Sequence, residues 1–564
     1  MRYLAVLICF STLLLAACGG GGGGGGGGIG AGAGGGTPPV NDDPPPTVEP
    51  TAQEMQEAAA LLNIATFGPT IAEIDSVARQ GTDAWLNDQF ALAPSRHLDI
   101  VVRYLDEYGT DTTTNIGNFR RFAFWENALT APDQLRQVTA YALTQIFVVS
   151  DQVGQIFNDP SALSSYYDML LDNAFGNFRD LLLDVTLHPA MGFYLSHVNN
   201  NRSNAQRNTF PDENYAREAM QLFTIGLYEL NEDGSWVLDS NGAPIATYDN
   251  SDIREFSKIF TGLSYGEGQS GRTPFFGNRQ RVFYVPMVMF DDNHEPGEKF
   301  LLNGQVVPDG QTGMQDIEDA IDNLFNHPNV GPFIGKQLIQ RLVTSNPSPE
   351  YVARISRVFA GEDGGVRGDM QAVVRAILTD PEASEALRLR EPFRRYVALN
   401  RSLGAVGDDG TYPALGNVNQ FLTRQNVLSS PSVFNFYLPV FSPAGPIKDQ
   451  GLVAPEFQIT DASTVIGVTN TVAYALFTEQ SIDSPRDWAR ITLDLSEYEA
   501  LVDDADAFLD RMDLQFFGGA LDADTRAIVT EVLLEQGGDA NLRTKVALYM
   551  ALVSPGYAVT GESP

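Results

Sequence analysis

Apolar residues recur at intervals of three and four along most of the chain after residue 53, which is the period of an amphipathic α-helix. The first such stretch covers residues 52–68. A second stretch, 70–81, opens with Thr70 and Glu73, which are spaced as a capping box. The same period predicts further helices at 135–150, 164–175, 178–187, 252–263, 369–378 and 541–554.

The clearest strand signal is a β-hairpin at 235–248, in which Ser240, Asn241 and Gly242 supply the turn. Strands and helices do not alternate in the way that builds a parallel sheet, so a doubly wound fold is disfavoured. We therefore expect a mainly α fold, a large multi-helix body with one small β-hairpin insertion. A Gly-rich and polar loop at 266–283 divides an N-terminal helical region (54–265) from a C-terminal one (284–564), which we expect to pack on the first.

The first residues read as an export signal. A basic Arg2 precedes an apolar run that is too short to span a membrane comfortably, which predicts a signal peptide at 1–17. The stretch Leu-Ala-Ala-Cys that ends at Cys18 resembles the lipobox of bacterial lipoproteins, and this resemblance implies cleavage before Cys18 and lipidation of its thiol. The alternative is an ordinary cleaved signal peptide with a chance cysteine.

Residues 18–53 then form a tether. Ten consecutive glycines followed by a Pro-rich stretch predict a disordered segment that reaches roughly 30–35 Å. The membrane, through lipid on Cys18, is therefore one expected partner. We expect an exported protein that is lipid-anchored to the cell envelope, at the outer membrane and facing the periplasm or the cell surface.

The charge of the chain excludes one class of partner. With 71 acidic and 36 basic residues the net charge is −35, and no Lys/Arg cluster supplies the basic footprint that a nucleic-acid binder needs. A strongly acidic surface favours solubility. The two cysteines, Cys9 and Cys18, would be removed and lipidated respectively, so we expect no disulfide and no cysteine nucleophile in the mature chain.

One stretch, "PDENYAREAMQLFTIGLYELN" at 211–231, concentrates ionisable residues at the start of a predicted helix. On a helical wheel Glu213 and Arg217 form an exposed pair at i,i+4. Glu218 lies within the apolar arc, with Asn214 at its border. A carboxylate that faces a core must be paired, hydrogen-bonded or protonated. Glu218 is therefore either a structural partner that joins helices, or a general acid/base or cation ligand in a cleft.

The five histidines show no compact ligand spacing, so we predict neither a metal site nor a cofactor. His188 precedes a proline at a helix junction, where a capping or packing role is the alternative to catalysis. His294 and Lys299 lie in the polar loop "DDNHEPGEKF", which could equally be a plain surface loop. If the protein is an enzyme, the catalytic candidates are Glu218 with His188 or His294. The substrate-binding candidates are then Asn214, Arg217 and Lys299.

Several blocks of the sequence resemble a bacterial family catalogued as domain of unknown function 1800. They include "LLNIATFGPTIAEIDSVARQGTDAWLNDQF", "PDENYAREAMQLFTIGLYELN", "HPNVGPFIGKQLIQRLV" and "PSVFNFYLP", and the resemblance covers about 52–559. It implies an exported protein. The family often has His where this chain has Phe223, so a role for that His cannot apply here. No reaction is established for the family, so the resemblance brings no catalytic residues.

Two classes of function remain open at this point. The first is a cell-envelope protein that binds an envelope protein or a polymer and acts in assembly. The alternative is an extracytoplasmic hydrolase that uses Glu218 with a nearby histidine. Convergence of Glu218, a histidine and Asn214 on one cavity would favour the enzyme.

Overall fold

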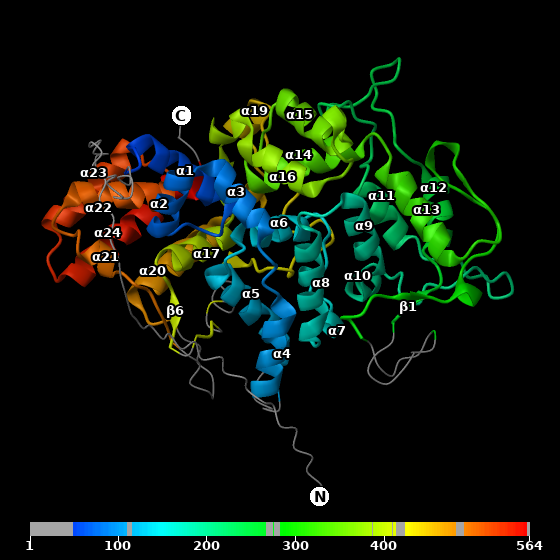
Figure 1. Ribbon diagram of the computed structural model, residues 1–564, viewed down its shortest axis with the longest axis horizontal. Coiled ribbons are helices and arrows are strands. Elements are labelled where there is room, and N and C mark those ends of the chain that lie inside the picture. The colour runs from blue at the N-terminus through cyan, green and yellow to red at the C-terminus, as the bar shows by residue number, and fades with distance from the viewer. Residues whose placement is uncertain are drawn as a thin grey trace, which may run out of the picture. The chain divides into compact units, whose positions relative to one another are not determined.

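The computed structural model describes residues 49–109, 115–266, 275, 282–385, 387–408, 410–412, 415, 423–480 and 490–560. The predicted signal peptide, Cys18 and all of the predicted tether before residue 49 lie outside this part of the chain, as does most of the predicted loop at 266–283. The described chain is mainly helical and carries small two-stranded sheets, which confirms the predicted fold class (Figure 1).

The helices before residue 260 follow the apolar period closely. The predicted capping box is present, because Thr70 and Glu73 exchange hydrogen bonds at the start of α2. The helices of this part are α1 (Ala52–Ala65), α2 (Ile71–Gln80), α3 (Thr82–Ala91), α4 (His97–Tyr108), η1 (Ile116–Asn118), α5 (Phe119–Thr130), α6 (Gln134–Thr144), α7 (Gly154–Phe157), α8 (Pro160–Asn173), α9 (Phe178–Leu187), α10 (Pro189–Tyr194), α11 (Asn214–Gln221) and α12 (Asn250–Ile259).

The middle of the chain alternates two-residue strands with longer helices. Strand β1 (Leu263–Ser264) pairs antiparallel with β2 (Val288–Met289), and β3 (Lys299–Phe300) pairs with β4 (Val306–Val307). Asp369 caps the predicted helix that follows it, since its side chain accepts a hydrogen bond from the N–H of Ala372. The helices here are η2 (Asp291–Asn293), η3 (Leu302–Gly304), α13 (Gly313–Phe325), α14 (Val330–Leu342), α15 (Pro349–Ala360), η4 (Glu362–Gly364), α16 (Met370–Thr379) and η5 (Pro381–Glu385).

The last part returns to the beginning of the chain. Helix α1 packs against η7 (Asp513–Phe517), so blue and red segments lie together in Figure 1. Strand β5 (Arg388–Leu389) pairs with β8 (Val559–Thr560), and β6 (Val406–Gly407) pairs with β7 (Ile491–Thr492). The remaining helices are α17 (Pro392–Ser402), α19 (Pro446–Asp449), η6 (Pro455–Ile459), α20 (Ala462–Phe477), α21 (Ser496–Glu499), α22 (Ala505–Met512), α23 (Ala523–Glu535), α24 (Ala540–Leu552) and α25 (Pro555–Ala558).

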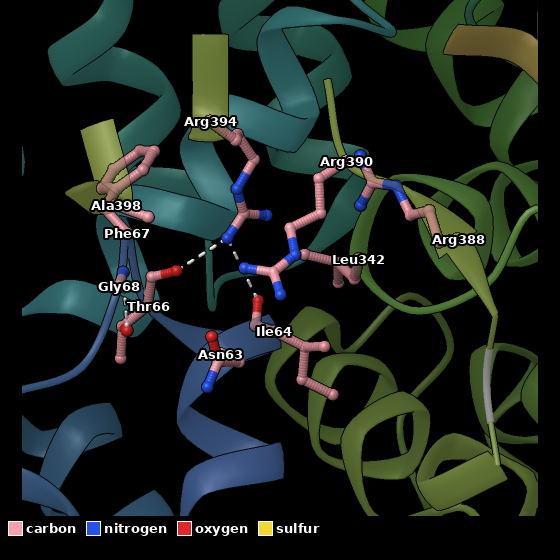
Figure 2. A pocket seen from close by; sticks show the side chains of 10 residues that line it. All are labelled: Asn63, Ile64, Thr66, Phe67, Gly68, Leu342, Arg388, Arg390, Arg394 and Ala398. Carbon is pink, nitrogen blue, oxygen red and sulfur yellow. Dashed lines mark hydrogen bonds between the residues drawn. The ribbon is translucent and has the colours of Figure 1, made fainter. Parts of the chain in front are cut away.

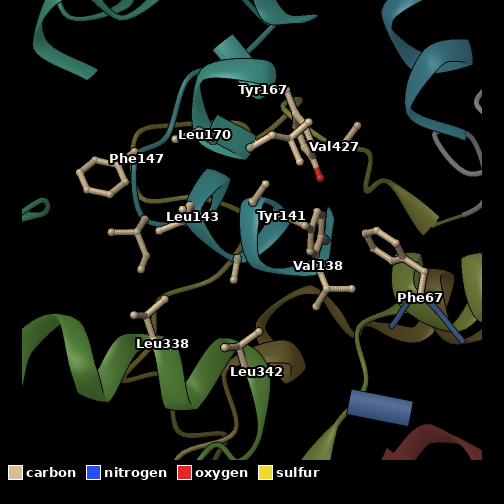
Figure 3. Close-up of a cluster of buried hydrophobic side chains, with 14 of the residues drawn as sticks. Phe67, Val138, Tyr141, Leu143, Phe147, Tyr167, Leu170, Leu338, Leu342 and Val427 are labelled. Carbon is tan, nitrogen blue, oxygen red and sulfur yellow. The ribbon is translucent and has the colours of Figure 1, made fainter. Parts of the chain in front are cut away.

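Helix α6 lies at the centre of the hydrophobic core, and all eleven of its residues are buried. It contacts α3, α8 and α14, so the core joins helices from both predicted regions. Figure 3 shows its Val138, Tyr141 and Leu143 between Leu338 and Leu342 of α14 on one side and Leu170 of α8 on the other. Its Gln134 and Arg136 donate to backbone carbonyls, as a buried position favours.

The predicted hairpin is present, and it has a third strand-like segment that the sequence did not indicate. Leu238 pairs with Pro244 across the turn, and Gly242 takes the positive φ that the turn needs. Residues 228–230 pair with both arms, through the bridges Tyr228–Ala246 and Leu230–Trp236. Residues 227–247 therefore form a three-segment β-insert, which we call the β-insert below.

Candidate functional site

Helix α11 is much shorter than the stretch 211–231 suggested. It ends at Gln221, and the N–H groups of Ile225 and Gly226 then bond back to the carbonyl of Met220 in a wide turn. Gly226 adopts φ of 72°, and a Cβ there would meet the ring of Phe333. A helical wheel continued past Gln221 is right for Phe223 and Ile225, which are buried. It is wrong for Thr224, which it places on the polar side, and for Leu227, which it places on the apolar side although this residue is exposed.

The error shows most clearly at Thr224. The wheel placed it on the polar face, but it is fully buried and its hydroxyl donates to the carbonyl of Ala219. The wheel is correct within α11 itself.

Glu218 is buried, as the wheel predicted, with 6% of its surface exposed. Among the described residues its carboxylate makes no hydrogen bond, and Oε2 is a buried atom without a partner. Burial raises the pKa of Glu218, and the nearby Arg217 opposes this only in part. Burial and, to a smaller extent, the charge of Glu218 raise the pKa of Tyr194 on α10 to about 12. Tyr194 is therefore a titratable neighbour of Glu218 on another helix.

The substrate-binding candidates of α11 lie on its outer side. Arg217 pairs with Glu213 at 3.2 Å, which confirms the predicted exposed pair. Asn214 is exposed at the start of the helix, and its backbone N–H bonds to the side chain of Asp212. Neither side chain shares a hydrogen bond with Glu218 in the described part of the chain, so the polar and the buried faces of α11 are separate.

His294 and Lys299 do come together, at a residue that the sequence analysis missed. His294 Nε2 lies 2.9 Å from Oδ2 of Asp316, and Lys299 Nζ lies 2.5 Å from the same oxygen. All three side chains are buried, so the loop that holds His294 is no plain surface loop at this point. Burial alone would raise the pKa of Asp316, but the hydrogen bonds from His294 and Lys299 lower it below its usual value.

A wheel of α13 could have indicated Asp316. It shares a helical face with Ala320 one turn later, and both are buried. His294 is held a second time, because its Nδ1 lies 3.0 Å from the carbonyl oxygen of Thr261. The cluster of His294, Lys299 and Asp316 thus fixes the loop after β2 to α12 and α13, and its ionic groups are already engaged with one another.

His188 stands at the junction between α9 and α10. Its Nδ1 accepts a hydrogen bond from the N–H of Ala190, and its ring meets Tyr166 edge-on at 5.1 Å. Burial lowers the pKa of His188 to about 3, so its imidazole is neutral. Hydrogen bonds connect neither His188 nor His294 to Glu218 among the residues that the structure describes.

The β-insert follows directly on α11. Thr247 donates to the carbonyl of Gly226 and closes its base. The buried Asn329, just before α14, donates to the carbonyls of Ile225 and Tyr228 and accepts from the N–H of Leu230. One edge of the insert is thereby fixed to the helical body.

The outer side of the β-insert is apolar and exposed. Trp236 is 57% exposed and Tyr228 is 38% exposed, and their ring centroids lie 5.4 Å apart. Leu227, Leu238 and Ile245 are exposed beside them in the sequence of the insert. In the pairing of the insert Trp236 and Leu238 lie on the same side as Tyr228, and strand alternation turns Leu227 and Ile245 to the other side. We call Tyr228, Trp236 and Leu238 the apolar face of the insert. Exposed apolar groups gathered in this way mark interaction surfaces more often than single exposed residues do.

Among the described residues, no group of three or more His, Cys, Asp or Glu side chains could hold a metal ion. Within the ranges that the structure describes, no helix combines the length and the apolar character that crossing a membrane requires.

Fold and site together define a mainly helical protein with a small β-insert and a buried, unpartnered carboxyl group beside it. The chain belongs to the family described as "Protein of unknown function (DUF1800)", whose model matches residues 60–559. This confirms the family resemblance of the sequence. No curated protein matches the chain. No solved structure matches it either.

Proposed function

We propose that this protein is exported, is lipid-anchored through Cys18, and binds another protein of the cell envelope through the apolar face of the β-insert. The anchor rests on the sequence of the first eighteen residues alone. The binding role is supported by one observation above all, the adjacent exposed rings of Tyr228 and Trp236. Tryptophan and tyrosine dominate the free energy of many protein interfaces, because each buries a large apolar area at a small cost in side-chain entropy.

The surroundings of the two rings favour a protein partner over a sugar polymer. Leu238 extends the surface with an aliphatic group, which suits an apolar protein interface core. The attachment through Asn329 also supports the proposal, since an insert held in place loses little entropy on binding.

The test is site-specific photo-crosslinking of the full chain in living cells. A photoreactive residue at Leu238 should give one discrete adduct with an envelope protein. The substitutions Tyr228→Ala and Trp236→Ala should remove it. Leu534 on α23 is 74% exposed and provides the matched control position, which should give no such adduct. The same adducts from both positions, or none from Leu238, would contradict the proposal.

A hydrolase that uses Glu218 is the second candidate. Its specific support is the buried carboxyl with a raised pKa and no hydrogen-bond partner, which are properties of a general acid. Tyr194 and Tyr248, whose pKa values its charge helps to raise, would be polar groups of the same site. Histidine would play no part unless His188 or His294 gave up its present hydrogen bonds. Release of reducing ends or free carboxylates from envelope material by the wild type, and not by Glu218→Gln, would favour this candidate.

A further inference from the structure

Three arginines line one small cavity between the end of α1 and the segment 388–398. Arg388 and Arg390 come from β5 and the residue that follows it, and Arg394 comes from the first turns of α17. The opposite wall is the end of α1 and the residues after it, 63–68, with Leu342 of α14 completing the lining. Figure 2 shows the guanidinium groups of Arg390 and Arg394 next to each other above Ile64 and Thr66. No acidic side chain lines this cavity.

The three guanidinium groups differ in their partners. Arg388 is paired with Glu456 at 3.0 Å. Arg390 and Arg394 have no carboxylate within 4.0 Å among the described residues; each donates to backbone carbonyls instead. Arg390 donates to Phe516 at 2.7 Å and Arg394 to Thr66 at 2.6 Å.

A guanidinium has five N–H donors, so these bonds leave most of each fork unused. The Nε of Arg390 is buried without any acceptor, although only 8% of this residue is exposed. Arg390 is therefore buried, and Arg394 is half-buried, without a carboxylate within 4.0 Å among the described residues, which is costly in a protein interior. The rings of Tyr557 and Phe67, which these guanidinium groups face, and the charge of Glu391 compensate this cost only in part.

Burial and neighbouring positive charges both lower the pKa of these groups. Burial, then the charges of Arg388 and Arg390, lower the pKa of Arg394 to about 10, although the charges of Glu391 and Tyr141 oppose this. Burial and the charge of Arg388 lower the pKa of Arg390 as well. Arg395, one residue further on α17, adds a third unpaired guanidinium, whose pKa burial and Arg390 lower to about 10. A positive field of this kind is unusual in a chain with a net charge of −35.

Capping explains only a part of this arrangement. The bond from Arg394 to Thr66 satisfies a carbonyl just after the end of α1, where a positive charge also meets the negative end of the helix dipole. That role requires one charged residue. It does not require Arg390, which approaches the same space from another element and increases the repulsion.

We propose that this cavity binds an oxyanion with two negative charges, a sulfate or phosphate group, between Arg390 and Arg394. Each planar guanidinium can bind two oxygens of such a group, and the two charges of the anion match the two arginines that lack a carboxylate partner. The cavity is small, so it takes the anionic group itself rather than the body of a large ligand. The site is independent of the apolar face of the β-insert.

The test is thermal unfolding of the full chain with added anions at constant ionic strength. Inorganic sulfate at about 20 mM should raise Tm by about 2–4 °C over chloride. The substitutions Arg390→Gln and Arg394→Gln should each remove this rise. The matched control is Arg490→Gln, which removes an arginine from an exposed ion pair with Glu479 and should keep the rise. An equal rise in all four proteins, or none in the wild type, would overturn the proposal.

Two further measurements of Tm with other anions define the ligand. Acetate should raise Tm less than sulfate, because it brings one charge; an equal effect would contradict the match of two charges. Inorganic phosphate and glucose 6-phosphate carry the same group, free and attached. A rise with the first alone assigns the cavity to a free ion, and a rise with both assigns it to a phosphorylated ligand.

The glutamine variants could lose stability because both arginines also bind carbonyls. The substitutions Arg390→Lys and Arg394→Lys keep the charge and remove the planar fork. Titration calorimetry should show sulfate bound at least about fivefold more weakly by either lysine variant than by the wild type. An unchanged affinity in both lysine variants would refute the site even if the glutamine variants fail to fold.

Discussion

The imidazole of His294 and the carboxylate of Asp316 meet at 2.9 Å inside the protein, 22 residues apart in the chain. The ammonium group of Lys299 binds the same carboxylate oxygen. This oxygen thus receives two donors from the loop after β2 and ties that loop to α13. The cluster contains His294 and Lys299, which are candidates for catalysis and substrate binding. Its geometry gives it a structural role, and the free energy of unfolding can measure how much it contributes.

We expect Asp316→Asn to destabilise the protein by about 3 kcal/mol or more at neutral pH, because it leaves the buried Lys299 without a counter-charge. The pKa of Asp316 is lower in the folded state than its reference value of 3.8. The stability that this carboxylate contributes is therefore present above pH 3.8 and is lost as the pH falls below it. Urea unfolding of both proteins at neutral and acidic pH would check this, and a difference that grows on acidification would contradict it.

The β-insert supplies a prediction with its own internal control. Asn329→Ala removes three hydrogen bonds to the backbone of 225–230 at a buried position, so it should cost about 3 kcal/mol. Trp236→Ala removes an exposed ring and should change stability by less than about 0.5 kcal/mol. Chemical unfolding of the two variants beside the wild type measures both. A large loss in Trp236→Ala would mean that the apolar face supports the fold.

The sequence predicted local structure well where its signals were local. The capping box of Thr70 and Glu73 and the cap of Asp369 each depend on residues three positions apart. The end of α11 was missed because it depends on Gly226 turning beside Phe333, which lies more than a hundred residues later. The third segment of the β-insert was missed because its residues were assigned to the helix predicted in the 211–231 stretch.

The candidate site was predictable only in part. The wheel found the burial of Glu218, because a helical face is a local property. It could not show that the carboxylate has no partner, since partners come from other elements. The arginine cavity could not be predicted from the sequence, because its walls come from residues 63–68, Leu342 and 388–398, which no sequence spacing relates.

The anchor can be tested without reference to the folded part. Cys18→Ser should release the protein from the membrane fraction and leave its unfolding transition unchanged, because the predicted tether separates the lipid from the helical body. Fractionation of cells and thermal unfolding of the released protein measure the two effects. Palmitate label that is still incorporated into Cys18→Ser would show that the lipid is attached elsewhere.

The two glutamates of the 211–231 stretch should differ in how neutralisation affects stability and its dependence on pH. Glu213→Gln removes only a half-exposed pair with Arg217 and should change stability by less than about 0.5 kcal/mol. Among the described residues, no donor bonds to the carboxylate of Glu218, so its removal would leave no donor without a partner. The hydrogen bonds therefore indicate no structural role for this carboxylate. Its folded-state pKa is raised above the reference value of 4.5, because burial disfavours its charge. The unfolded chain therefore gains more than the folded one from ionisation at higher pH, and the carboxyl costs stability above pH 4.5.

We accordingly expect Glu218→Gln to be neutral or stabilising by up to about 1 kcal/mol at pH 7. The gain should disappear below pH 4.5, where the wild-type carboxyl is protonated in both states. Urea unfolding of the wild type, Glu213→Gln and Glu218→Gln at pH 7 and at acidic pH separates the possibilities. A loss on the order of 3 kcal/mol in Glu218→Gln would show that the carboxylate holds helices together. A gain in stability would show that the carboxyl of Glu218 weakens the fold. A group that weakens the fold is retained for another purpose, so Glu218 would then be the first residue to examine for activity.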